Sequence, residues 1–213
     1  MKLYSYFRSS AAYRVRIGLA LKNLAFNLAP VHLVKHGGEH KLPDYTAINP
    51  QQLVPAFETA DGEVLTQSLA ILEFLEESYP QTPLLPTDKV ARAKVRALCQ
   101  MIACDIHPLN NLRVLTYLKN ELNISDEQKT VWYQHWVTQG FEALEIMLPE
   151  QAKFCYGDTP TLADCCLIPQ VYNALRFNCD MSQYPKIWQI YQHCNTLAAF
   201  INASPEQQRD APK

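Results

Sequence analysis

The start of the fold is decided by the stretch Ser9-Ser10-Ala11-Ala12-Tyr13-Arg14-Val15-Arg16-Ile17-Gly18-Leu19-Ala20-Leu21. It follows a short segment, Lys2 to Phe7, whose composition is typical of a β-strand. Apolar residues in the stretch recur at helical spacing, which predicts a helix with one buried face and Arg14 outside that face. Ser9 or Ser10 is then the natural N-cap.

The beginning of such a helix is also a possible anion site. The first N–H groups of a helix have no intrahelical acceptor and carry about half a positive charge, so they favour an anion. A serine hydroxyl beside them could hydrogen-bond a thiolate. Two interpretations stay open from this stretch alone: Ser9 and Ser10 only cap the helix, or they also bind a reactive anion.

The composition excludes several classes of protein. A net charge of −2 and a pI near 6.3 give no basic surface for nucleic acid or anionic membranes. No apolar run approaches the ~20 residues of a membrane span, and no signal peptide is apparent. The seven cysteines form an odd set without a C-x-x-C pair, which predicts reduced thiols and a cytoplasmic location.

The first eighty residues give the element order β-α-β followed by β-β-α. Phe26 to Val34 reads as a second strand, parallel to the first. Asp61-Gly62 is a turn signal between two further short strands, and Ser68 is expected to cap the helix that follows. This order predicts an α/β, thioredoxin-like domain over residues 1–80.

A proline-rich linker, residues 81–87, separates this domain from a region with a different hydrophobic pattern. Residues 88–213 show only helical patterns and predict an all-α domain. Thr161 and Asp164 form a capping-box pattern at the start of one of its helices. His107 to Arg113 interrupts another helix with polar groups, which is either a solvated face or a part of a site. The polar tail, Ser204 to Lys213, is expected to be loosely ordered.

Other chemistries find little support. His32, His36 and His40 recur every fourth residue, but Gly37 and Gly38 break any helix there, so no metal site is predicted. No phosphate-binding loop, nucleophile elbow or H-E-x-x-H pair occurs. Four arginines, each of which alone reads as a surface charge, lie near capped or interrupted elements and suit carboxylates: Arg8, Arg14, Arg113 and Arg176.

Several motifs resemble one family over nearly the whole chain, the zeta-class glutathione transferases. Phe7-Arg8-Ser9-Ser10, running into Arg14-Val15-Arg16-Ile17, is the most specific of them. The others are Asn49-Pro50, Val54-Pro55, Gln67-Ser68-Leu69-Ala70-Ile71 and Pro169-Gln170-Val171. The resemblance implies glutathione as the cofactor, a dicarboxylate substrate, a homodimer, and cis–trans isomerisation of maleylacetoacetate in aromatic amino-acid breakdown.

The resemblance also implies a set of site residues. Ser9, Ser10, Arg8 and Arg176 are the expected catalytic residues, with the thiol of glutathione near the two serines and the arginines near substrate charge. Pro55 is expected to follow a cis peptide bond. Glutathione is expected to contact Ser9, Ser10, Ala11, Ala12, Tyr13, Arg14, His40, Val54, Pro55, Gln67, Ser68, His107, Asn111, Leu112 and Arg113.

The chemistry that the resemblance implies is physically reasonable. A thiolate that adds to the conjugated double bond and then leaves allows rotation and returns unchanged. Two departures from the family pattern are Ala11, where many members have cysteine, and Leu112, where maleylpyruvate isomerases have arginine. The alternatives are maleylpyruvate isomerisation, displacement on α-haloacids, and a non-catalytic binding module of the same fold.

Overall fold

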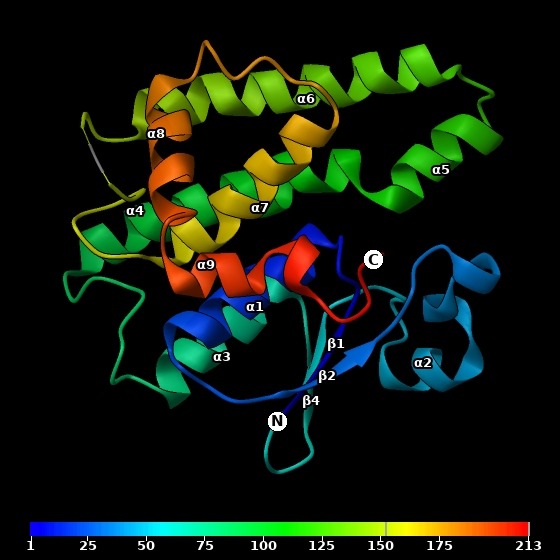
Figure 1. Ribbon diagram of the computed structural model, residues 1–213, viewed down its shortest axis with the longest axis horizontal. Coiled ribbons are helices and arrows are strands. Elements are labelled where there is room, and N and C mark those ends of the chain that lie inside the picture. The colour runs from blue at the N-terminus through cyan, green and yellow to red at the C-terminus, as the bar shows by residue number, and fades with distance from the viewer. Residues whose placement is uncertain (152, 213) are drawn as a thin grey trace. The chain divides into compact units, whose positions relative to one another are not determined.

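The computed structural model describes residues 1–151 and 153–212, which form two compact units. The first unit joins Met1–Leu84 to Asn195–Lys213, and the second is Leu85–Cys194. The sequence predicts one helical domain over residues 88–213, but its last segment groups with the N-terminal residues instead. The cause is helix α9 (Ala198–Ala203), which packs along helix α1 (Ser10–Leu21) of the first unit (Figure 1).

The first unit is built on a four-stranded sheet with the order β2-β1-β3-β4. Strand β1 pairs parallel with β2 and antiparallel with β3, and β3 pairs antiparallel with β4. This is the thioredoxin-like arrangement that the sequence predicts, although β2 is shorter than Phe26 to Val34. The strands are β1 (Lys2–Ser5), β2 (Asn27–Pro30), β3 (Ala56–Glu58) and β4 (Val64–Thr66).

Alternate residues of the strands cover the two faces of this sheet. Leu3 and Phe57 pack against Val15 of α1 and Ile71 of α3 (Ser68–Ser78) on one face. On the other face, Tyr4 and Ala56 pack with Tyr45 of the short helix α2 (Pro43–Ile48). The remaining short helical turns of the unit are η1 (Lys35–Gly37), η2 (Glu39–Lys41) and η5 (Pro205–Gln207).

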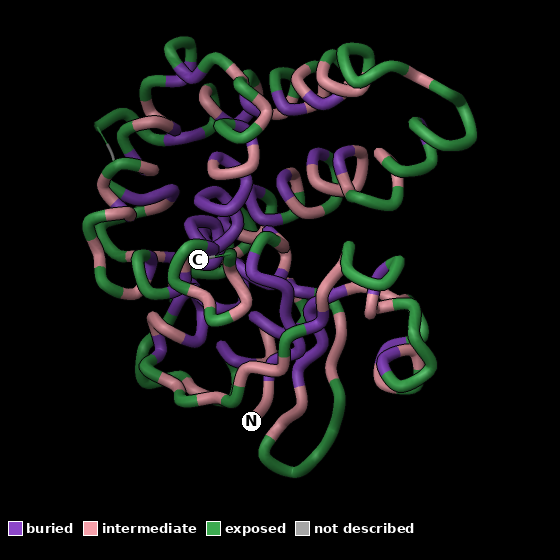
Figure 2. The backbone as a smooth tube through the Cα atoms, turned by 45° about the vertical axis from the view of Figure 1, so that its right-hand side comes forward, coloured by how far each residue is buried: buried purple, intermediate pink, exposed green. Residues whose placement is uncertain are grey.

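Helix α1 is buried on nearly all sides, as the purple stretches of Figure 2 illustrate. Arg14 and Arg16 are each 2% exposed and Lys22 is 7% exposed, so the expectation that Arg14 lies outside the buried face is wrong. Each of the three has a hydrogen-bond partner far along the chain, which is Ser68 for Arg14, Ala203 for Arg16 and Glu76 for Lys22. Gly18 lets α1 approach α3 closely, because a Cβ atom there would overlap the side chain of Leu72.

The second unit is helical, as predicted. Its first helix, α4, changes type before His107: a π-helical segment, η3, is followed by a 3-10 turn, η4, which contains Pro108. Capping boxes begin two helices, at Ser125 with Gln128 and at Thr161 with Asp164, and the second of these confirms the sequence prediction. The elements are α4 (Lys89–Gln100), η3 (Met101–Ile106), η4 (His107–Asn110), α5 (Leu112–Asn120), α6 (Asp126–Met147), α7 (Leu162–Arg176) and α8 (Pro185–Cys194).

Among the described residues, none of the helices combines the length and apolar character that crossing a membrane requires.

Candidate active site

Four segments of the first unit meet at one end of the sheet, and the strand register places them there. Tyr4 pairs with Ala56, and Ala56 pairs with Thr66. The C-terminal ends of β1 and β4 therefore lie beside the start of β3. Because β2 runs parallel to β1, with Ser5 opposite Pro30, the loop that follows β2 leaves the sheet at the same end.

The segments gathered in this way include most of the predicted site residues. They are the start of α1 after β1, the loop after β2, the Val54-Pro55 peptide before β3, and the start of α3 after β4. We call this end of the sheet the sheet-end site; it comprises Ser9–Ala12, His32–Lys41, Val54-Pro55 and Gln67-Ser68.

Ser9 is the N-cap of α1. Its backbone is extended, and its Oγ accepts a hydrogen bond from the N–H of Ala12 at 3.2 Å. The hydroxyl hydrogen remains available for an acceptor outside the helix, since a serine both donates and accepts. Ser10 is the first residue of the helix and is buried. The structure therefore distinguishes the two serines: Ser9 caps the helix and is half-buried.

The start of α3 forms a second anion-favouring position. Gln67 is the N-cap residue with a positive φ of 69°, and its Nε2 donates to Oε1 of Gln51 at 2.8 Å. Ser68 does not cap the helix, contrary to the sequence prediction. Its Oγ instead accepts a hydrogen bond from Nη1 of the buried Arg14 at 3.1 Å. A buried guanidinium thus lies next to a helix N-terminus, and both favour a carboxylate.

The Val54-Pro55 peptide bond is cis, as expected. The preceding carbonyl of Leu53 is fixed by two donors, the Tyr45 hydroxyl at 2.6 Å and the Asn49 side-chain amide at 2.7 Å. Burial, only partly offset by the hydrogen bond with Asn49, raises the pKa of Tyr45 to about 12. Tyr45 therefore stays a neutral donor at physiological pH, and Val54 is held at the edge of the sheet-end site.

The loop after β2 contributes His40. Burial, followed by the charge of Lys41, lowers the pKa of His40 below its usual value, so the ring is neutral near pH 7. Its Nδ1 is buried and has no hydrogen-bond partner among the described residues. His32 has another role: its Nδ1 accepts from the N–H groups of Val34 and Lys35 and so orders the loop.

The remaining predicted residues of the first unit have different surroundings. Arg8 is exposed and lies over aromatic rings, with its guanidinium carbon 5.9 Å from the ring centroid of Tyr6 and 5.7 Å from that of Phe7. Tyr13 is buried, and its hydroxyl donates to the carbonyl of Phe200 at 3.4 Å, so its side chain contacts α9.

In the second unit, the residues predicted from the polar interruption cluster with one another. The side-chain amide of Asn111 lies 3.4 Å from Nε2 of His107. Asn111 also caps α5, because its Oδ1 accepts from the N–H of Arg113 at 3.1 Å. Leu112 and Arg113 are exposed in the first turn of α5. The interruption is thus a helix start with a polar cluster, and His107 is half-buried in it.

Arg176 ends α7 and is exposed. Its Nη1 donates to Oδ1 of Asn173 at 3.3 Å, and its guanidinium carbon is 5.8 Å from the ring centroid of Phe177. A guanidinium at this exposed position suits a carboxylate by its charge and planar geometry.

Two residues that support the segment before Ser9 are not predicted as site residues from the sequence. Arg16 donates to the carbonyl of Phe7, and Asp210 accepts from the N–H of the same residue, both at 2.9 Å. Arg16 has the helical spacing of an ordinary charged residue. Asp210 lies in the tail that we expected to be loosely ordered, 203 positions from Phe7. No local pattern relates residues so far apart.

Comparison with known proteins adds a sequence relationship. Residues 8–78 match the family model described as the glutathione S-transferase N-terminal domain. A probable maleylacetoacetate isomerase of Vibrio cholerae is 49% identical over 98% of this chain and 97% of its own length. The maleylacetoacetate isomerase of Pseudomonas aeruginosa is 46% identical over 100% of this chain and 99% of its own length.

Solved structures agree in fold. A maleyl pyruvate isomerase in its holo form, described as a bacterial zeta-class glutathione S-transferase, has a TM-score of 0.96 and 44% identity with complete coverage of both chains. A maleylacetoacetate isomerase of Anaeromyxobacter dehalogenans, with bound dicarboxyethyl glutathione and citrate, has a TM-score of 0.87 and 40% identity. The match covers 100% of this chain and 97% of that one.

Proposed function

We propose, because this chain belongs to the zeta class of the glutathione transferases, that it catalyses the glutathione-dependent isomerisation of maleylacetoacetate to fumarylacetoacetate. One observation supports this most directly: Ser9 caps α1 at the sheet end where Val54 and Gln67-Ser68 also lie. A hydroxyl, an extended backbone edge and a helix N-terminus are the groups that a thiol peptide with a free carboxylate requires.

The residues of the sheet-end site fit glutathione part by part. The α3 start, with Gln67, Ser68 and the neighbouring buried Arg14, suits the γ-glutamyl carboxylate. The backbone of Val54 suits the cysteinyl peptide, and neutral His40 suits the glycine end. Ala11 offers an N–H group of the first turn, whereas the N–H of Ala12 donates to Oγ of Ser9, so Ala12 can only line the site. The proposal that His107, Asn111, Leu112 and Arg113 contact glutathione rests on the family resemblance.

Ionisation of the thiol is the central task of the protein. A free thiol, with a pKa near 8.5, is only a few per cent ionised at pH 7. Each unit by which the pKa is lowered corresponds to ~1.4 kcal/mol, a magnitude that a helix N-terminus and a serine hydrogen bond together supply. Ser9 is the principal donor, since its Oγ accepts from Ala12 and its hydrogen is left to donate. Ser10 is the second candidate.

When bound, glutathione supplies a thiolate that adds reversibly to the conjugated double bond, which rotates as a single bond before the thiolate leaves. The protein must meanwhile stabilise the negative charge that develops on the substrate carbonyl, next to substrate carboxylates. Arg8 and Arg176 are proposed for this role, with Arg113 also available. All three are exposed, so each guanidinium is accessible to an anion from solvent.

The direct test is the loss of maleylacetoacetate absorbance with and without glutathione. We expect isomerisation only when glutathione is present, because the thiolate of glutathione is the proposed nucleophile. Ser9→Ala should raise the thiol pKa of bound glutathione and lower kcat by about tenfold or more, with a smaller effect on glutathione affinity. Ser78→Ala, an exposed serine at the end of α3, is the control. Unchanged kcat in Ser9→Ala would reject the assigned role.

Maleylpyruvate is the second candidate substrate, supported by the similarity to maleyl pyruvate isomerase and by the His107–Asn111 cluster. Leu112 cannot supply the carboxylate contact of an arginine, which favours the larger substrate. A comparison of kcat/KM on the two maleyl compounds decides between them.

Turnover of α-haloacids alone would indicate a dehalogenating transferase, and failure to bind immobilised glutathione would indicate a non-catalytic module.

Assembly and location complete the proposal. We propose a homodimer, as the family resemblance implies, which light scattering of the purified protein tests directly. A monomer would contradict it. A reducing cytoplasm is supported by the cysteines, all seven of which are free thiols.

A further inference from the structure

The connection between β1 and α1 carries Ser9 and is fastened by groups from the C-terminal tail. Within the connection itself, the N–H of Ser9 donates to the carbonyl of Tyr6 at 2.9 Å. This single turn has neither a helix nor a strand to maintain it. The direction of the Ser9 side chain therefore depends on what holds the peptide groups before it.

Arg16 holds one side of the connection. Its Nη2 donates to the carbonyl of Phe7 at 2.9 Å, its Nη1 to Oγ of Ser5 at 3.0 Å, and its Nε to the carbonyl of Ala203 at 2.9 Å. Arg16 is 2% exposed, so these bonds form without competition from water. Through Arg16, the end of α9 is joined to the peptide that precedes Ser9.

Asp210 holds the other side. Its Oδ2 accepts the N–H of Phe7 at 2.9 Å, and the neighbouring Ala211 packs on the cluster that contains Tyr6 and Phe7. Both polar groups of Phe7 are thus bonded to charged side chains, which makes stronger hydrogen bonds than neutral partners do. Through Asp210 and Ala211, the described part of the tail therefore packs against the connection that carries Ser9.

We propose that Asp210 is a positioning residue for Ser9. It orients the Phe7 peptide, and this peptide in turn orients the Ser9 hydroxyl that stabilises the thiolate of bound glutathione. The inference rests on the proposed function, because it assigns to the tail a role in that site. A purely stabilising tail would affect unfolding and leave the thiol unchanged. The two roles therefore predict different measurements.

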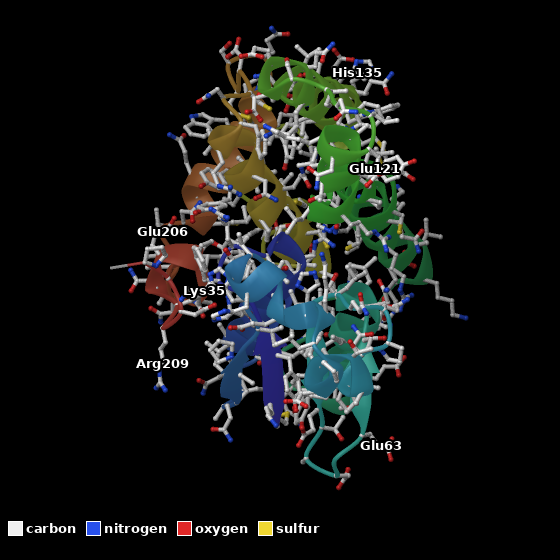
Figure 3. The ribbon with its side chains drawn as sticks, turned by 90° about the vertical axis from the view of Figure 1, so that its right-hand side faces the viewer. Lys35, Glu63, Glu121, His135, Glu206 and Arg209 are labelled. Atoms are coloured by element: carbon white, nitrogen blue, oxygen red, sulfur yellow. The ribbon has the colours of Figure 1, made fainter. Side chains whose placement is uncertain are left out.

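The experiment compares Asp210→Ala, Asp210→Asn and Asp210→Glu with the parent protein. Asparagine keeps an acceptor for the Phe7 N–H, alanine removes it, and glutamate keeps the charge but moves the acceptor by one methylene. The control is Arg209→Gln, since Arg209 is exposed and extends away from the ribbon (Figure 3). For each variant, the thiol pKa of bound glutathione is read from thiolate absorbance, together with kcat, the KM for glutathione and the thermal midpoint.

We expect Asp210→Ala to raise the thiol pKa and to lower kcat about tenfold, with less than about a twofold change in KM, as displacement of a catalytic donor requires. Asp210→Asn should lie within about threefold of the parent, and Asp210→Glu between the two. A lower thermal midpoint with unchanged thiol pKa and kcat in Asp210→Ala would overturn the proposal. If alanine prevents folding, parental values in Asp210→Glu would overturn it. If the parent itself neither ionises glutathione nor isomerises substrate, the proposed function fails instead.

Discussion

Lys22 shows how much a single buried charge organises in this chain. Its Nζ lies 2.7 Å from Glu76 and donates to the carbonyls of Tyr79 and Thr82 at 2.9 and 2.8 Å. Glu76 in turn accepts the N–H of Leu84 at 2.9 Å. The pair thereby fixes the proline-rich segment that follows α3.

Replacement of Lys22 by methionine should destabilise the protein by about 3–5 kcal/mol, because it leaves the Glu76 carboxylate buried without its cation. The double variant Lys22→Met, Glu76→Leu should recover much of this loss, since it removes both charges. Urea unfolding of both variants measures the difference. Equal stability of the single variant and the parent would show that the pair is not desolvated in solution.

Tyr45 gives a prediction in the alkaline range. Burial raises its pKa to about 12 from a usual value near 10, so the folded protein holds the proton more tightly than the unfolded chain. Its contribution to stability is therefore present below pH 10 and is lost as the pH rises from about 10 to 12. Tyr45→Phe should reduce this loss. Denaturant unfolding at pH 9 and pH 11 for both proteins tests it, and equal pH dependence would contradict it.

At this scale, sequence motifs mark segments that the strand register brings to one end of the sheet, but they do not reveal the buried charges that support these segments. Ser9, Val54 and Gln67 were predicted from motifs, and their segments do meet. Arg14, Arg16 and Lys22 were invisible as buried groups, because charged residues on a helix ordinarily face water. What buries them is a set of partners that are distant in sequence, such as Ser68 and Ala203.

The two capping boxes allow the same kind of helix cap to be compared at a buried and at an exposed position. Thr161 caps α7 in the buried interior, where Asp164 also accepts from the N–H of Cys155 at 2.7 Å. Ser125 caps α6 at an exposed position. Thr161→Ala should cost about 2 kcal/mol of unfolding free energy, and Ser125→Ala about 0.5–1 kcal/mol. Equal losses in urea unfolding would show that burial of the cap contributes nothing.

Elements with local signals were predictable, and those decided by tertiary contacts were not. The Asp61-Gly62 turn and the Thr161 capping box are local, and both predictions are confirmed. The π-helical segment Met101–Ile106 has ordinary helical residues, so nothing in them marks its different hydrogen-bond spacing. The tail was misjudged because its polar composition gives no sign of the hydrogen bond that the N–H of Phe7 donates to Asp210.

The whole molecule contains seven free cysteines with very different access to solvent. Burial raises the pKa of Cys155, Cys165 and Cys194, and it raises that of Cys179 to about 11. Because thiolates are the reactive form, these thiols should resist an aromatic disulfide reagent at pH 8 until the protein unfolds. Exposed Cys104 should react at once, and Cys104→Ser should remove the fast phase. Rapid labelling of several thiols in the folded protein would contradict this.

The meeting of four chain segments at one sheet end has a consequence for the lifetime of the protein. A tripeptide bound there adds contacts between segments that strand pairing and a few side-chain hydrogen bonds already join, so it acts as a further noncovalent crosslink of the native state. At a hundred times its dissociation constant, such a ligand adds about 2.7 kcal/mol to stability. Resistance to proteolysis should therefore rise with glutathione concentration, and the abundance of the enzyme would follow the thiol supply of its surroundings.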